Sequence, residues 1–210
     1  MASDREELAG ILEDYDEVYW IISPTAVTTH RFPLRGYAGH SGRLDVIVRT
    51  AHALYGISQG EALLLATLLG PPRPPLTLAY TGECIQPAMS ERALAAVTQR
   101  VLAGRRVGSC IAFKAGVEDV LSLIRIRGFK LLLLKEGGLD LFRASWALSG
   151  KAVYIAGAHV DIPGDIERLL VRYSNAVISL GPVSLLTSHA IAFVAWARRV
   201  CGSKLESIEN

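Results

Sequence analysis

The sequence is poor in cysteine and contains no long apolar run, although half of its 210 residues are hydrophobic. Its three cysteines, Cys84, Cys110 and Cys201, are widely spaced and include no C-x-x-C pair. This spacing argues against a zinc site and a disulfide framework, and it favours a reducing, cytoplasmic environment. Because no apolar run approaches the roughly 18 to 20 residues that span a bilayer, we expect no membrane among the partners. We likewise expect no bound metal.

Several widespread binding and catalytic motifs are also missing. No G-x-G-x-x-G segment and no P-loop occurs, so a dinucleotide or triphosphate site has no motif to support it. A nucleophile elbow with a Ser-His-Asp arrangement is absent as well. His159 and His189 could serve as metal ligands, but no third ligand is evident. Helix capping or a core hydrogen bond is the alternative role for each.

Charge is distributed unevenly along the chain, although the net charge is only +2. Residues 1–18 contain seven acidic side chains against Arg5, whereas residues 92–130 contain eight basic ones against Glu118 and Asp119. A local basic excess of this kind attracts polyanions such as RNA. An ordinary solvated surface has the same composition, so both interpretations stay open.

The order of the apolar segments predicts an α/β fold. Short apolar runs without alternation, separated by helical patterns, are typical of a largely parallel sheet covered by helices on both faces. We expect strands at residues 18–23, 130–136, 152–157 and 177–180, while residues 61–70 fit a strand or a helix equally well. Residues 1–17 are predicted to be an acidic N-terminal extension, either a short helix or a frayed end. Residues 18–201 would then form a single domain and residues 202–210 a flexible tail.

A helix is predicted at residues 42–56, where apolar side chains recur at helical spacing. Ser41 is the expected N-cap and Gly56 the expected end, and the preceding residues 24–42 are predicted to form a loop. Asp45 and Arg49 are four residues apart on this helix, so a surface salt bridge is the simplest interpretation of the pair.

Three loops that contain glycine follow the predicted late strands, at residues 135–138, 157–159 and 181–189. In one parallel sheet these loops would gather around a single cleft at the carboxyl ends of the strands, where ligands usually bind. The last loop opens with Gly181-Pro182 and closes with Thr187-Ser188, both good N-caps for the final helix. An ordinary strand-to-helix connection is the alternative for this segment.

Four segments together resemble one known family. Residues 42–56 (GRLDVIVRTAHALYG), 68–83 (LLGPPRPPLTLAYTGE), 153–159 (VYIAGAH) and 178–194 (ISLGPVSLLTSHAIAFV) are similar, in order and spacing, to the archaeal tRNA pseudouridine N1-methyltransferases. These enzymes are the TrmY branch of the SPOUT superfamily. The resemblance implies a SPOUT-type α/β fold with a C-terminal trefoil knot, S-adenosylmethionine as cofactor and a homodimer. It also implies methylation of N1 of pseudouridine in the T loop of tRNA, at position 54.

The resemblance also assigns roles to individual residues. It places the cofactor against the three glycine loops, at Leu134, Gly138, Gly157, Leu180, Gly181, Pro182, Val183, Ser184, Leu185 and Ala190. RNA would contact Arg43, Arg49 and Lys114. Asp45 or His189 is the expected acceptor of the proton that leaves N1, although water is an alternative.

The second loop departs from the family pattern, because the family has Gly-Asp-His where this chain has Gly157-Ala158-His159. The third loop also differs, with Leu186, Ser188 and Ala190 at positions where the family has other residues. Two alternatives therefore accompany the tRNA methyltransferase hypothesis. One is methylation of a ribosomal pseudouridine, and the other is a SPOUT-fold protein that binds RNA without catalysis.

Overall fold

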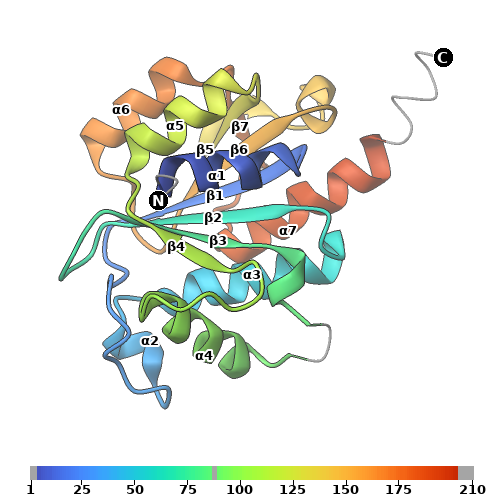
Figure 1. Cartoon of the computed structure of the whole chain (residues 1–210). Coiled ribbons are helices and arrows are strands. Elements are labelled where there is room, and N and C mark those ends of the chain that lie inside the picture. Colours follow the sequence, from blue (N-terminus) through green and yellow to red (C-terminus); the bar gives the residue numbers. More distant parts are fainter. Residues whose placement is uncertain (1–3, 87–88, 203–210) are drawn as a thin grey trace.

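The computed structural model describes residues 4–86 and 89–202 and shows one seven-stranded sheet between two layers of helices (Figure 1). The strands are β1 (Glu17–Ser23), β2 (Leu63–Leu68), β3 (Leu76–Tyr80), β4 (Ile111–Phe113), β5 (Lys130–Asp140), β6 (Ala152–Gly157) and β7 (Ala176–Ser179). The α-helices are α1 (Asp4–Glu13), α2 (Tyr37–His40), α3 (Leu44–Ser58), α4 (Glu91–Leu102), α5 (Val117–Ile126), α6 (Gly164–Tyr173) and α7 (Thr187–Ala197). Shorter turns are η1 (Gly82–Cys84), η2 (Ser145–Leu148) and η3 (Arg198–Gly202).

The sheet has the order β4-β3-β2-β1-β6-β5-β7, and its five central and late strands β2, β1, β6, β5 and β7 are parallel. The predicted, largely parallel α/β fold is therefore confirmed. Only β3 and β4 run antiparallel to their neighbours. The proline-rich turn between β2 and β3 is too short for a crossover, so the chain can only reverse there. The trefoil knot implied by the resemblance stays a prediction.

Both faces of the sheet are buried, which explains why its strands are apolar without alternation. Tyr19 and Ile21 of β1 pack with residues of α3, α4 and α7, whereas Trp20 and Ile22 pack on the opposite face with α1, α5 and α6. Figure 1 shows the two helical layers on either side of the strands. No helix within the described residues is long and apolar enough to cross a membrane.

The acidic N-terminal segment forms the helix α1, one of the two possibilities expected from the sequence. Leu8 and Leu12, one turn apart, are fully buried in the core that α5 and α6 also line. On the polar side, Glu7 pairs with Arg106, and Glu13 pairs with Arg127 at 2.7 Å. The acidic charge of this segment therefore offsets part of the basic charge between residues 92 and 130.

Several predicted boundaries were wrong. Helix α3 extends two residues past Gly56 to Ser58, because Gln59 takes the left-handed conformation of the C-cap instead. The loop at residues 24–42 contains the short helix α2. Residues 135–138 do not end β5: the strand continues to Asp140, and its pairing with β7 shifts register between Leu134 and Leu139.

Cys84 and Cys110 form a disulfide, contrary to the expectation of no disulfide framework. The two residues are 26 positions apart in sequence, but their Cα atoms are 5.6 Å apart. Because β3 and β4 are antiparallel neighbours, the end of one strand lies next to the start of the other. This pairing depends on a strand reversal that cysteine spacing alone does not reveal. Cys201 is free.

Candidate functional site

A cavity of about 670 Å³ lies at the carboxyl edge of β6, β5 and β7. These neighbouring parallel strands end at the same edge, so their three loops meet there. The walls consist of residues 133–136, 156–162, 179–181 and 183–188, with Glu167, Ala190 and three residues of the α3 region, Arg43, Val46 and Arg49. As expected, residues of all three glycine-containing segments line one cleft, although residues 135–138 belong to β5 and do not form a loop.

The second loop is tied to the start of α7 by a side-chain hydroxyl. Thr187 Oγ1 lies 2.8 Å from the carbonyl oxygen of Gly157 and 2.6 Å from that of Ala158. The prediction that Thr187 and Ser188 cap this helix was wrong, because Leu186 is at the N-cap position and makes no side-chain cap. Thr187 is instead inside the first turn, where its hydroxyl fixes the wall of the cavity.

An ion cluster at the start of α3 forms another wall. Arg43 donates from Nε and Nη2 to the two carboxylate oxygens of Asp45, at 2.9 and 3.1 Å. Arg49 Nη2 donates to Asp45 Oδ2 at 3.3 Å, so the predicted Asp45–Arg49 pair is confirmed. The Asp45 carboxylate is buried, while both arginines are about half exposed and line the cavity.

The glycine before this cluster is required by close packing. Gly42 has a φ of +61°, and a Cβ added there would lie 1.8 Å from the carbonyl oxygen of Thr25. Ser41, the predicted N-cap, accepts a hydrogen bond from the backbone of Leu44, but Arg43 occupies the cap position with a φ of +68°. The turn therefore presents the Arg43 side chain to the cavity.

The electrostatics of the cluster keep Asp45 ionised. Burial by itself would raise the pKa of Asp45, but the hydrogen bond and charge of Arg43, together with the charge of Arg49, lower the net pKa below its ordinary value. Arg49 also pairs with Glu91 at 3.6 Å, but both guanidinium groups stay about half exposed at the cavity wall. Such a pair suits an anionic group such as a phosphate.

Most of the sequence-predicted site residues lie at this cavity. The lining includes Arg43, Arg49, Leu134, Gly157, Leu180, Gly181, Val183, Ser184, Leu185 and Ala190. The structure therefore brings together both predicted RNA-binding arginines of the α3 region and most of the predicted cofactor contacts.

Five predicted residues do not line the cavity. Asp45 is behind its two arginines, Pro182 is exposed near the start of the third loop, and His189 is exposed in the first turn of α7. Gly138 is between strands, where an added Cβ would lie 2.6 Å from the carbonyl oxygen of Val177. Lys114 is exposed at the end of the edge strand β4, with β3, β2 and β1 between it and β6.

Comparison with known proteins identifies the chain's relatives. The family described as "Putative SAM-dependent RNA methyltransferase" matches residues 17–199. The chain belongs to this family. A relative from Aeropyrum pernix is 38% identical over 184 residues, which cover 86% of this chain and 93% of the relative's own. That relative is named tRNA (pseudouridine(54)-N(1))-methyltransferase. A relative from Methanosarcina mazei has the same name and is 30% identical over 185 residues, which cover 83% of this chain and 86% of the relative's own.

A solved structure shares the fold of this RNA methyltransferase family member. The crystal structure of Archaeoglobus fulgidus Nep1 bound to S-adenosylhomocysteine superposes with a TM-score of 0.62, covering 87% of this chain and 97% of that one. The sequences are 16% identical, so the likeness concerns the fold.

Sequence reasoning missed several polar residues of the cavity in this RNA methyltransferase family member. Lys135 pairs with Glu167, and Glu136 and Asp161 also line the walls. Only Asp161 lies in a loop that follows a strand, whereas Lys135 and Glu136 are within β5 and Glu167 is within α6, so sequence position gave little signal for them. No group of three or more His, Cys, Asp or Glu side chains gathers as a potential metal site in the portion of the chain that the structure describes.

Proposed function

We propose that the protein transfers a methyl group from S-adenosylmethionine to N1 of pseudouridine 54 in tRNA. The observation that carries this proposal is the cavity at the carboxyl edge of β6, β5 and β7, with two arginines on one wall. The relatives from Aeropyrum pernix and Methanosarcina mazei, which carry the name of this activity, support the choice of substrate.

The cavity fits the cofactor in size and chemistry. A volume of about 670 Å³ is within the range of pockets that hold a molecule of this size. Leu134, Leu180 and Ala190 offer apolar surface, and the backbone at Gly157 and Gly181 is accessible at the loops between them. Nep1, which shares the fold, binds S-adenosylhomocysteine. When bound, the sulfonium cofactor supplies an electrophilic methyl group.

The acceptor chemistry explains why pseudouridine is the substrate. Its N1 carries a proton and a lone pair that becomes available when the proton leaves, whereas N1 of uridine is bonded to ribose. Arg43 and Arg49 on the cavity wall bind the RNA backbone and hold the base in place, and such alignment accounts for much of a rate enhancement.

We assign Asp45 to positioning rather than to proton transfer. A general base needs a free lone pair near the substrate and a pKa close to the working pH. The Asp45 carboxylate accepts hydrogen bonds from Arg43 and Arg49, and their charges lower its pKa. Asp45 therefore orients the two arginines, and the N1 proton passes to another acceptor.

We further propose that the protein works as a homodimer through an aromatic surface on α7 and the segment after β5. Phe193 contacts Phe142 edge-on at 5.8 Å between ring centres, and it contacts Trp196 at 6.0 Å. Phe142 and Trp196 are about half exposed, while Ile191 and Val194 of the same helix face the core. A helix that is apolar on both sides needs a second covering surface.

Methyl transfer to matched RNAs tests the activity. The purified protein is given labelled S-adenosylmethionine and tRNA transcripts that carry either pseudouridine or uridine at position 54. We expect transfer to the pseudouridine transcript alone. Equal transfer to both transcripts would contradict the assignment. If calorimetry shows cofactor binding but neither RNA is methylated, the non-catalytic alternative is favoured. Ala158→Asp is then the variant to test for methyl transfer.

A further inference from the structure

A second basic surface lies outside the cavity, on α4 and the loop before α2. We name it the α4 surface, and it consists of Arg31, Arg35, Arg92, Arg100 and Arg105. Residues 24–42 and 92–110, which supply these arginines, contain no aspartate or glutamate. The local charge is therefore positive along two segments that are distant in sequence.

The five arginines are exposed, and in residues 4–86 and 89–202 their side chains form no hydrogen bond or ion pair. By contrast, Arg106 pairs with Glu7 and Arg127 pairs with Glu13, while Arg125 and Arg172 on the opposite face lie over the ring of Tyr173. The α5 and α6 face carries Glu118, Asp119, Asp165 and Glu167 among its arginines, whereas the only acid of α4 is Glu91, its first residue.

The loop that carries Arg31 is fixed to α4. Gln99 Nε2 donates to the carbonyl oxygens of His30 and Phe32, at 3.0 and 2.7 Å. These bonds hold the residue between them, Arg31, close to the part of α4 that carries Arg100. Phe32 is also buried in the core, so the loop is anchored from both sides.

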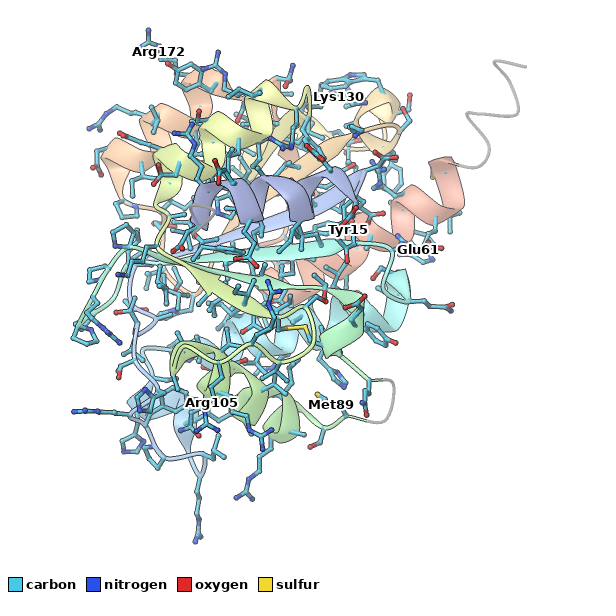
Figure 2. All side chains as sticks on the ribbon, viewed as in Figure 1. Tyr15, Glu61, Met89, Arg105, Lys130 and Arg172 are labelled. Atoms are coloured by element: carbon cyan, nitrogen blue, oxygen red, sulfur yellow. A yellow bond between two sulfur atoms is a disulfide. The ribbon has the colours of Figure 1, made fainter. Side chains whose placement is uncertain are left out.

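The α4 surface connects to the cavity through the first residue of α4. Glu91 accepts a hydrogen bond from Tyr37 at 2.7 Å and pairs with Arg49, which lines the cavity, at 3.6 Å. A helix of 12 residues is about 18 Å long, so α4 leads from the cavity wall across several phosphate spacings. In Figure 2, Arg105 lies on the α2 and α4 side of the molecule, and Arg172 lies at the opposite end.

From this arrangement we infer that the α4 surface binds the phosphate backbone of the tRNA beyond the loop that contains the target nucleotide; the inference rests on the proposed function. Arginines without acid partners bind phosphates with release of counterions. Neither of the two segments exposes a large apolar side chain, and a protein partner would require one at the centre of its interface. Phosphate contacts of this kind position an RNA without reading its sequence.

Charge-matched double variants test the inference. Arg100→Gln/Arg105→Gln removes two charges from the α4 surface, and Arg125→Gln/Arg172→Gln removes two exposed charges from the α5 and α6 face. The dissociation constant for tRNA is measured against salt concentration, with S-adenosylhomocysteine present. Because each lost phosphate contact lowers the slope of log affinity against log salt by roughly 0.7 to 0.9, the slope of the first variant should be smaller by about 1.4 to 1.8. The second should keep the wild-type slope.

A short oligonucleotide separates the α4 surface from the cavity. The single-stranded target loop alone should bind the Arg100→Gln/Arg105→Gln variant as it binds wild type, because it does not reach the α4 surface. For full tRNA we expect a KM at least tenfold higher, with kcat at saturating RNA and the affinity for S-adenosylhomocysteine unchanged. An unchanged salt slope, an equal loss in the two double variants, or an equal loss with the oligonucleotide would each overturn the inference.

The same measurements separate this inference from the proposed function. If wild type transfers no methyl group but tRNA binding still depends on Arg100 and Arg105, RNA binding by the α4 surface is supported and the proposed activity is contradicted. If wild type methylates tRNA and Arg100→Gln/Arg105→Gln binds and methylates tRNA as wild type does, the proposed activity is supported and RNA binding by the α4 surface is contradicted.

Discussion

Arg43 and Asp45, two residues apart, form a bidentate ion pair, with Nε 2.9 Å from Oδ1 and Nη2 3.1 Å from Oδ2. Arg43 has a left-handed backbone conformation, which non-glycine residues rarely adopt. Its guanidinium is therefore aimed by two constraints, the turn at Gly42 and the carboxylate of Asp45. Two parallel charge-assisted bonds fix the plane of the guanidinium as well as its position.

Replacing Asp45 with asparagine should weaken RNA binding while leaving the affinity for S-adenosylhomocysteine unchanged. Asparagine has nearly the same shape but carries no charge, so Arg43 and Arg49 lose their common anchor. Because a hydrogen bond to a charged group contributes about 1.5 to 3 kcal/mol and both arginines remain solvated, we expect a loss of about 1 to 2 kcal/mol in the free energy of unfolding. Urea denaturation and tRNA titration measure the two effects. Weakened cofactor binding would contradict the placement of Asp45 behind the cavity wall.

The stability difference between wild type and Asp45→Asn should depend on pH in one direction. The folded-state pKa of Asp45 lies below its ordinary value, so its contribution is complete above the ordinary carboxylate pKa of about 3.9 and is lost as the pH falls through the folded-state value. We therefore expect a constant difference near neutral pH that shrinks below about pH 4. A difference that grows on acidification would contradict this linkage.

Replacing Gly138 with alanine should force β5 and β7 apart. The added Cβ would lie 2.6 Å from the carbonyl oxygen of Val177, a backbone atom that cannot rotate away. We expect a loss of about 1 to 3 kcal/mol in stability and weaker cofactor binding, because both strands end at the cavity. Gly10→Ala is the control: it is exposed within α1, nothing lies near its added Cβ, and alanine there should stabilise by about 0.5 to 1 kcal/mol. Equal effects in the two variants would refute this role of Gly138.

The cleft was predictable from sequence because it depends on strand direction alone. Apolar runs at β1, β6 and β7 lack alternation, and parallel strands bring their final residues to one edge. The chemistry of each loop residue was harder to predict. Gly138 belongs to a glycine loop by sequence, but its conformation serves the approach of two strands, because β5 continues past the expected loop.

Long-range pairs could not be predicted for a different reason. Glu17 accepts hydrogen bonds from Arg199 at 3.2 Å, although 182 residues separate the two. Cys84 and Cys110 likewise meet only because β3 and β4 reverse the chain. Sequence spacing carries information about one helix face or one strand, whereas these contacts depend on how distant elements are placed.

Replacing Gly181 with alanine should lower both stability and cofactor affinity. Gly181 lines the cavity with a φ of +123°, and nothing lies near its added Cβ, so the cost arises from backbone strain of about 1 to 3 kcal/mol. Relief of that strain would move the loop. Gly104→Ala is the matched control, because Gly104 has a φ of +81°, equally open surroundings and no place in the cavity lining. Thermal melts should show lower stability in both variants, whereas calorimetry with S-adenosylhomocysteine should show lower affinity only in Gly181→Ala. An unaltered affinity in Gly181→Ala would mean that the loop does not contact the cofactor.

Replacing Trp196 with glutamate should dissociate the proposed homodimer. Trp196 is 48% exposed and extends the aromatic contacts of Phe193 and Phe142 on the surface of α7. A charge at the centre of an apolar interface loses its hydration without gaining a partner, so association should weaken by at least a hundredfold.

The control is Ile126→Glu on α5, where a 73% exposed apolar residue is replaced outside the aromatic surface. Sedimentation at micromolar concentration should give a dimer for wild type and for Ile126→Glu, and a monomer for Trp196→Glu. Phe142→Glu should repeat the dissociation, which guards against a folding defect in the first variant. A wild-type protein that sediments as a monomer would refute the proposed dimer, and dissociation by Ile126→Glu would place the interface on α5 instead.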